Sequence, residues 1–194
     1  MKKDPAQKII LDFLKKRGLK STEISGGLLN FQIDMSPKLL NDAPPEYKAA
    51  LEEFTSFSKL DCVLYASNYY EDELTDQYMV TMEIRFPDEI PPGLAGQASK
   101  YITLLNQRLH WSHFVMHTPG FLVTSRIKNY MKLSWIDEAF LDEMIESNVE
   151  SYMMASTGFM LIVHEAVTAH TAINVFDNIQ LGEPPLNLGN RFPI

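Results

Sequence analysis

Three histidines lie close together in the middle of the chain, and imidazole is a common protein ligand for zinc. They are His110, His113 and His117, spaced three and four residues apart. On one continuous helix this spacing would place the three rings on one face, as a zinc site requires. The surrounding residues instead favour a strand, on which His113 and His117 share a face but lie about 13 Å apart at ~3.3 Å per residue. We therefore expect no metal and no cofactor, and His113 and His117 are the candidate ligands if a metal does bind.

The other polar residues are not spaced for a recognised reaction. His164 and His170 are six residues apart, whereas the zinc-binding helix of a metalloprotease has its histidines four residues apart. The carboxylates between Asp137 and Glu146 fit the start and the solvated side of a helix. Cys62, the single cysteine, lies in an apolar run and is expected to be a small buried side chain. We expect no catalytic residues and predict that the protein is not an enzyme.

The composition narrows the possible partners and compartments. The 194 residues include 17 basic and 25 acidic ones, which gives a net charge of −8, whereas a protein that binds duplex nucleic acid normally carries a basic face. One cysteine excludes an internal disulfide. The N-terminus has no apolar signal segment. His164, Glu165 and His170 interrupt the apolar stretch 152–176, and the uninterrupted apolar run is too short to span a bilayer. We expect a cytoplasmic protein that binds neither nucleic acid nor membrane.

Alternating apolar residues indicate a sheet with one buried face. Between Tyr78 and Phe86 every second residue is apolar, and Glu83 and Arg85 face the other way. A later strand shows the same pattern, with Arg126 and Lys128 on its second face. The expected strands are 29–35, 61–69, 78–86, 113–117 and 121–130, and the expected helices are 4–17, 94–109 and 134–149, with a further helical stretch to about 175. The order α-β-β-β-α-β-β-α predicts an α+β fold with an antiparallel sheet of about five strands and helices mainly on one face.

Proline-rich and glycine-rich segments divide the chain. We interpret residues 1–176 as one α+β domain, with a helical insertion at 36–60 that contains three prolines. The remaining residues, 177–194, are expected to form an irregular tail because prolines and glycines recur there.

Individual residues predict where helices begin, end or bend. Asp4 is expected to cap the first helix and Ser134 the long C-terminal helix. A kink or a break is expected at Thr157-Gly158, and Gly96 is expected to allow close packing near the start of its helix.

One block of the sequence resembles a known family. It consists of Tyr101-Ile-Thr-Leu-Leu-Asn106-Gln-Arg-Leu109, His113-Phe-Val-Met-His, Pro119-Gly120 and Phe121-Leu-Val-Thr-Ser-Arg126. This block is similar to the YbjN family of bacterial sensory transduction regulators, and the resemblance covers roughly Ile9 to Met154, with 36–60 as an insertion. The resemblance implies a fold like that of type III secretion chaperones. It also implies a small cytoplasmic dimer that acts through protein contacts, and it brings no catalytic residues.

Soft apolar side chains on the long C-terminal helix predict how such a module would bind. Met153, Met154, Phe159 and Met160 either belong to the core or form an adaptable surface that accepts a partner by repacking. A helix that is apolar on more than one face would need a second subunit to cover it. We therefore hypothesise a non-enzymatic protein-interaction module, chaperone-like or regulatory, that acts as a homodimer in the bacterial cytoplasm.

Two alternatives to this hypothesis stay open. The first is a small metal-dependent or small-molecule-binding enzyme that uses the histidines around His113. The second is a protein that binds a peptide by adding it as a strand to a free edge of the sheet.

Overall fold

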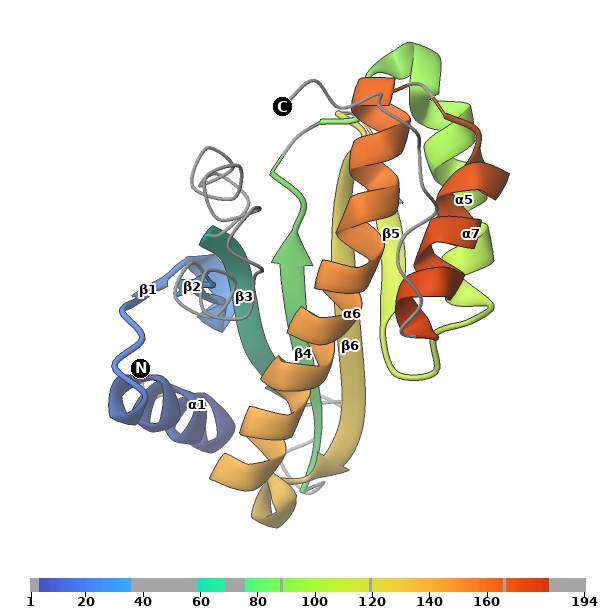
Figure 1. The fold of residues 1–194 in the computed structure, drawn as a ribbon. Helices are drawn as coiled ribbons and strands as arrows, with labels where there is room; N and C mark the ends of the chain where they lie inside the picture. The colour runs from blue at the N-terminus through green and yellow to red at the C-terminus, as the bar shows by residue number, and fades with distance from the viewer. Residues whose placement is uncertain are drawn as a thin grey trace.

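The computed structural model of the chain describes residues 4–35, 59–68, 76–87, 89–118, 120–165 and 167–181 (Figure 1). Its strands are β1 (Ser21–Glu23), β2 (Leu29–Asp34), β3 (Lys59–Asn68), β4 (Gln77–Arg85), β5 (His113–His117) and β6 (Leu122–Lys132). Its α-helices are α1 (Pro5–Lys16), α5 (Ala95–Asn106), α6 (Glu138–Glu165) and α7 (Ala169–Gln180). The predicted helical insertion, up to residue 58, and the chain after Leu181 lie outside the described residues.

The strands form one antiparallel sheet, so the predicted α+β class is confirmed. Their order across the sheet is β1-β2-β3-β4-β6-β5, and every neighbouring pair is antiparallel. The sheet has six strands rather than the expected five because Ser21–Glu23 pairs with β2. This strand is only three residues long and mainly polar, so it shows no apolar alternation.

The described helices all pack on the same face of this sheet (Figure 1). α1 lies against β3, α6 crosses β4 and β6, and α5 lies against β5. α7 packs on α5 and α6. One continuous core joins buried residues from every one of these helices to a single face of the strands, represented by Leu64 on β3, Met82 on β4 and Ile127 on β6. The helices are therefore confined to one side, as predicted.

Aromatic rings fill the core beneath α6. Phe159 is fully buried, and its ring lies 4.9 Å from that of Tyr101 in an edge-on arrangement. Its ring also lies 5.4 Å from that of Phe86 and 5.7 Å from that of Phe114. These centroid distances are favourable for aromatic pairs. Phe159 on α6 thus contacts rings from α5, from β5 and from the residue that follows β4.

The helix termini agree with the sequence in one case and correct it in another. Asp4 caps α1 as predicted, because its Oδ1 accepts a hydrogen bond of 2.8 Å from the backbone N–H of Ala6. The cap of α6 is Asp137 rather than Ser134, since Asp137 Oδ1 accepts from the backbone N–H of Phe140 at 2.8 Å. Ser134 belongs to the preceding 3₁₀ turn, η3 (Leu133–Trp135).

α6 also continues where a kink or break was expected. It passes through Thr157-Gly158 without interruption and ends at Glu165. α7 then begins after Thr168, whose hydroxyl accepts a hydrogen bond from the backbone N–H of Thr171. Within the described part of the chain, no helix is long and apolar enough to cross a membrane.

Candidate interaction surface

The face of the sheet opposite the helices is covered by none of the described helices. Residues that pair across neighbouring strands share a face of the sheet. The row Val63–Glu83–Arg126–His113 runs from β3 through β4 and β6 to β5 on this opposite face. We call this surface the open sheet face.

An ion pair lies at the centre of the open sheet face. Arg126 Nη2 on β6 is 2.6 Å from Glu83 Oε1 on β4, and their side chains are 23% and 14% exposed. Both charges are thus largely withdrawn from water but remain paired. Removal of one partner would leave the other charge largely buried and unpaired, which is strongly unfavourable. It marks the middle of the face as a fixed polar centre.

The end of the open sheet face beyond Thr81 combines lysines with apolar surface. Lys128, Tyr130 and Lys132 occupy alternate positions of β6, and both lysines are exposed. Tyr130 is 60% exposed and pairs in register with the half-buried Met79. Tyr65 lies in the same row as Lys128, on the other side of Thr81. We call Tyr65, Met79, Lys128, Tyr130 and Lys132 the lysine–tyrosine patch.

The acidic residues of the open sheet face lie outside this patch. Glu83 is paired with Arg126, and Asp61 Oδ1 accepts a hydrogen bond of 2.7 Å from Gln32 Nε2. Asp34 is paired in register with Lys59 at the far end of β2 and β3. The lysines of the patch make no ion pair with a residue that the structure describes. Asp76 lies beside the Lys132 end of the patch, where its Oδ1 accepts a hydrogen bond of 3.3 Å from the backbone N–H of Leu133, and it forms no ion pair with either lysine.

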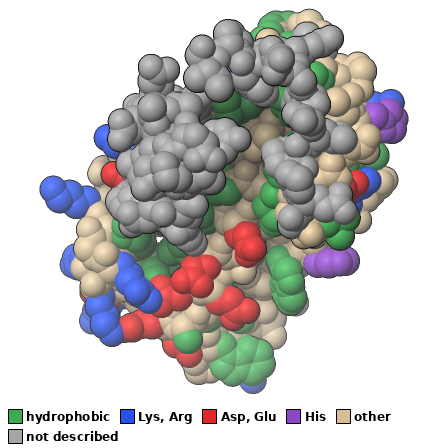
Figure 2. Space-filling view, viewed as in Figure 1, with side chains coloured by type: hydrophobic (Ala, Val, Ile, Leu, Met, Phe, Trp, Pro, Cys, Tyr) green, Lys and Arg blue, Asp and Glu red, His purple; other side chains and the backbone are tan. Residues whose placement is uncertain are grey.

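The helix side carries a cluster of acidic residues. Figure 2 shows acidic side chains gathered over the first half of α6. The exposed carboxylates of that half are Glu138, Glu143, Glu146 and Glu150. These four of the 25 acidic residues lie on the side of the molecule away from the open sheet face.

The candidate metal ligands lie on the open sheet face, at the outer strand β5. His113 and His117 share this face, as predicted for a strand, and His113 is exposed. His117 Nε2 lies 3.0 Å from Thr124 Oγ1, within hydrogen-bonding distance. Among the described residues, no three histidine, cysteine, aspartate or glutamate side chains are grouped closely enough to hold a metal ion. The structure therefore explains His117 as a partner of Thr124.

The four residues of the predicted methionine surface on α6 differ in how deeply they are buried. Phe159 is fully buried, so its ring belongs to the core and offers no surface. Met153, Met154 and Met160 are half-buried and pack against the core with part of each side chain accessible. Their role in binding a partner stays a prediction.

We call the block between Tyr101 and Arg126 that resembles the YbjN family the family-like block. Two of its polar residues form hydrogen bonds or ion pairs within the structure. Asn106 Nδ2 donates to the carbonyl of Phe114 at 2.9 Å, and the N–H of Phe114 donates to Asn106 Oδ1 at 2.7 Å. The Asn106 side chain therefore occupies the backbone groups of Phe114 that a further strand would bind. It hinders the addition of a peptide strand at this point of the outer strand β5. Arg126 forms the central ion pair with Glu83.

Buried polar groups elsewhere serve the packing of α6 on the sheet. Ser125 Oγ donates to Asn148 Oδ1 at 2.6 Å, and Asn148 Nδ2 is 3.4 Å from the carbonyl of Met82.

Cys62 is fully buried, as predicted. Burial, together with the charge of Asp61, raises the pKa of its thiol to about 12, so the thiol is protonated and unreactive at neutral pH.

Comparisons with known proteins do not place the chain in a family. No model of a protein family matches it, and no curated protein matches it. The resemblance of the block between Tyr101 and Arg126 to the YbjN family stays a prediction.

Proposed function

We propose that the protein is a non-enzymatic interaction module that binds another protein through its open sheet face. The observation that carries the proposal is the placement of the described helices on one side of a six-stranded sheet. A sheet face with exposed Tyr130 and half-buried Met79, Tyr65 and Val115 offers apolar area beside charged groups. Tyrosine and methionine are enriched at the centres of protein interfaces, and polar groups form the rim.

The proposal includes a chaperone-like or regulatory role as a cytoplasmic homodimer. The family-like block supports this role, and the accessible parts of Met153, Met154 and Met160 on α6 supply a second apolar surface. The alternative, a metal-dependent enzyme built on His113, gains no support from the described residues, because His113 and His117 have no third ligand beside them.

Site-specific photocrosslinking tests the proposed surface. Benzoylphenylalanine replaces Tyr130 in one variant of the full chain and Lys15 on the exposed side of α1 in a matched control. We expect irradiation in an extract of the native cell to give a discrete protein adduct only from the Tyr130 variant. The captured protein is then identified by mass spectrometry, purified and titrated against the unmodified chain. Adducts of equal yield from both variants, or a captured protein that does not bind in the titration, would contradict the proposal.

A further inference from the structure

We propose that the lysine–tyrosine patch binds an acidic segment of a partner protein, with carboxylates on either side of an apolar side chain. This inference rests on the proposed function and specifies the chemistry of the partner. Its starting point is the contrast between a chain of net charge −8 and the exposed lysines of the patch, which have no ion-pair partner among the described residues.

The spacing of the patch defines the partner. Lys128 and Lys132 are four residues apart on β6, on the same face of the sheet, and a strand of this length spans about 13 Å. Tyr130 lies between them and beside Met79. Two carboxylates at a similar separation would reach both ammonium groups, and an apolar side chain between the carboxylates would cover Tyr130 and Met79. An extended segment with acidic residues four positions apart has this spacing.

The net charge of the chain does not prevent an acidic partner from binding. Charges separated by more than the Debye length, about 8 Å at physiological ionic strength, are largely screened. The carboxylates of Glu138, Glu143, Glu146 and Glu150 belong to α6, which packs on the opposite side of the sheet. Asp76 lies closer, beside the Lys132 end of the patch, because its Oδ1 accepts a hydrogen bond from the backbone N–H of Leu133. A partner on the patch would therefore experience the two lysines, with the positive charge partly offset at the Lys132 end.

Two other occupants fit the patch less well. A second copy docked through the same face would place lysines opposite lysines, which is unfavourable. A single-stranded nucleic acid needs a groove of positive charge that follows its backbone. On this face the positive residues are interrupted, because Glu83 is paired with Arg126 and Asp61 lies beside Arg85.

Fluorescence anisotropy with three labelled probes tests the proposal on the full chain. The first probe is a peptide that contains Glu-Ser-Phe-Ser-Glu, in which both glutamates and the phenylalanine lie on one face of the extended chain. The second has glutamine in place of each glutamate, and the third is an oligothymidylate. We expect the acidic peptide to bind at least about tenfold more tightly than the glutamine peptide, and its affinity to fall as salt is added.

Matched lysine variants locate the binding site. The double variant K128Q/K132Q is expected to weaken binding of the acidic peptide about tenfold. K8Q/K15Q removes the same charge from exposed positions of α1 and is expected to leave binding unchanged. A third variant, Y130S, tests the apolar part of the patch and is expected to weaken binding of both peptides. Circular dichroism confirms that each variant is folded.

Several results would overturn the proposal. These are equal affinities for the two peptides, equal losses in K128Q/K132Q and K8Q/K15Q, or tighter binding of the oligothymidylate that is lost with the same lysines. A specific adduct from the Tyr130 crosslinker without a preference for the acidic peptide would refute this inference and leave the proposed function standing. Failure of both experiments would refute both.

Discussion

Gly158 allows the backbone of α6 to touch the side chain of Tyr101. A Cβ atom at this position would lie 2.1 Å from Tyr101 Oη and 2.3 Å from Tyr101 Cζ. The Tyr101 hydroxyl also donates a hydrogen bond of 3.1 Å to the carbonyl of Ala155. Burial is the main cause that raises the pKa of Tyr101 above its ordinary value. The phenol is thus held neutral and closely packed at the centre of the core.

Gly158→Ala is expected to destabilise the protein, although helix propensity alone predicts the reverse. Alanine is favoured over glycine in a helix by about 1 kcal/mol. The overlap with a fully buried ring costs more, typically about 1–3 kcal/mol and sometimes above that. Because the overlap is severe, we expect a cost near the upper end of this range. Less the gain in helix propensity, the free energy of unfolding, measured by urea denaturation, should fall by about 2 kcal/mol.

Gly96→Ala is the matched control, because it also lies in a helix but nothing would approach its Cβ within 4 Å. This variant is expected to be neutral or more stable by up to about 1 kcal/mol. In the double variant G158A/Y101L the costs should be less than additive, since leucine lacks the hydroxyl and the ring atoms that the new Cβ meets. A Gly158→Ala protein as stable as Gly96→Ala would show that the contact is unimportant.

The two glycines also show what the sequence can reveal about single residues. The sequence suggested close packing at Gly96 and a kink or break at Thr157-Gly158. In the structure the close contact is at Gly158 instead, nothing approaches Gly96, and α6 continues through Gly158. The neighbour that decides the matter, Tyr101, is distant in sequence. Caps depend on nearby residues, and Asp4 was accordingly predicted correctly.

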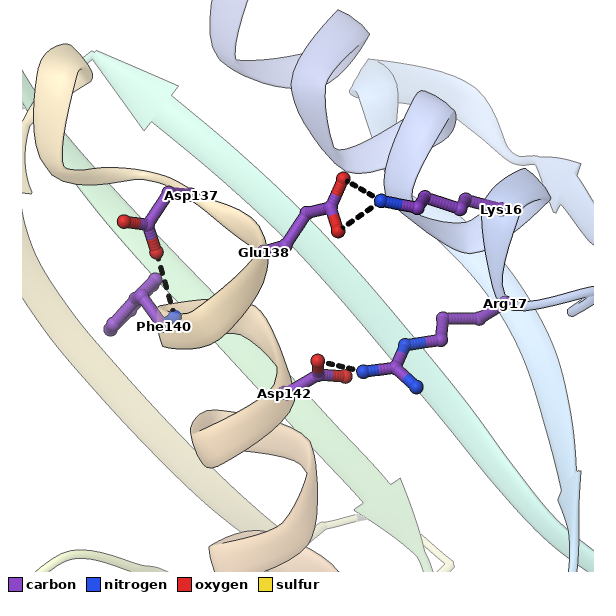
Figure 3. Close-up of polar contacts among 6 residues, drawn as sticks. All are labelled: Lys16, Arg17, Asp137, Glu138, Phe140 and Asp142. Carbon is purple, nitrogen blue, oxygen red and sulfur yellow. Dashed lines mark hydrogen bonds and ion pairs between the residues drawn. The ribbon is translucent and has the colours of Figure 1, made fainter.

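At the scale of elements, two sets of ion pairs connect neighbouring helices, and the paired side chains differ in their exposure to solvent. Lys16 Nζ at the end of α1 lies 2.6 Å from Glu138 Oε2 at the start of α6, and Arg17 pairs with Asp142 one turn later (Figure 3). The Lys16 and Glu138 side chains are 67% and 55% exposed. Exposed pairs of this kind contribute between about 0 and 1 kcal/mol.

Arg108 and Asp177 form a more enclosed pair between the end of α5 and α7. Arg108 Nε donates to Asp177 Oδ1 at 2.6 Å, and Nη2 donates to Oδ2 at 2.9 Å. The two side chains are 32% and 35% exposed. The hydrogen bonds to Asp177 are the main cause that raises the pKa of Arg108 above its ordinary value. Two-point pairing of an arginine with a carboxylate is stronger than a single contact.

Arg108→Met is therefore expected to cost more stability than Lys16→Met. We expect a loss of about 1 kcal/mol for Arg108→Met and less than about 0.5 kcal/mol for Lys16→Met. Urea denaturation at low and at high salt provides the measurement, and the loss at Lys16 should disappear at high salt. Equal losses at both positions would mean that the exposure of these pairs does not decide their strength.

The sequence predicted most elements because each depends on a local pattern. The bounds of β5, His113–His117, were predicted without error, and alternation located the other long strands to within two residues. The break between the C-terminal helices was misplaced, since the chain leaves the helix before Thr168 rather than at Gly158. Threonine is a common helix-capping residue, so Thr168 indicated the true start of α7. The prediction relied on Gly158 instead.

At the scale of the molecule, the open sheet face could be predicted only in part. Alternation assigned Glu83, Arg126 and Lys128 to the face away from the core, and the structure agrees. The register between strands, which pairs Glu83 with Arg126 and aligns Tyr65 with Lys128, depends on contacts between distant segments. The patch therefore emerges only when the strand order is known.

The proposed homodimer would place two molecules of net charge −8 in contact. If the accessible parts of Met153, Met154 and Met160 meet across a two-fold axis, antiparallel crossing of the α6 helices would keep their acidic first halves apart. Residual repulsion between the subunits is screened by salt. Dimer formation should thus strengthen with salt, whereas binding of an acidic peptide to the patch should weaken.

Size-exclusion chromatography with light scattering at several salt concentrations tests this expectation. We expect a mass of about twice the 22.2 kDa of one chain at micromolar protein, with a dimer fraction that rises with salt. Met160→Lys is expected to shift the protein towards monomer, because it introduces a charge into the apolar surface. Glu150→Gln, one helical turn before Met153 and Met154, removes a repulsive charge and should favour the dimer. A monomer at every salt concentration would leave α6 without the proposed role and restrict partner binding to the open sheet face.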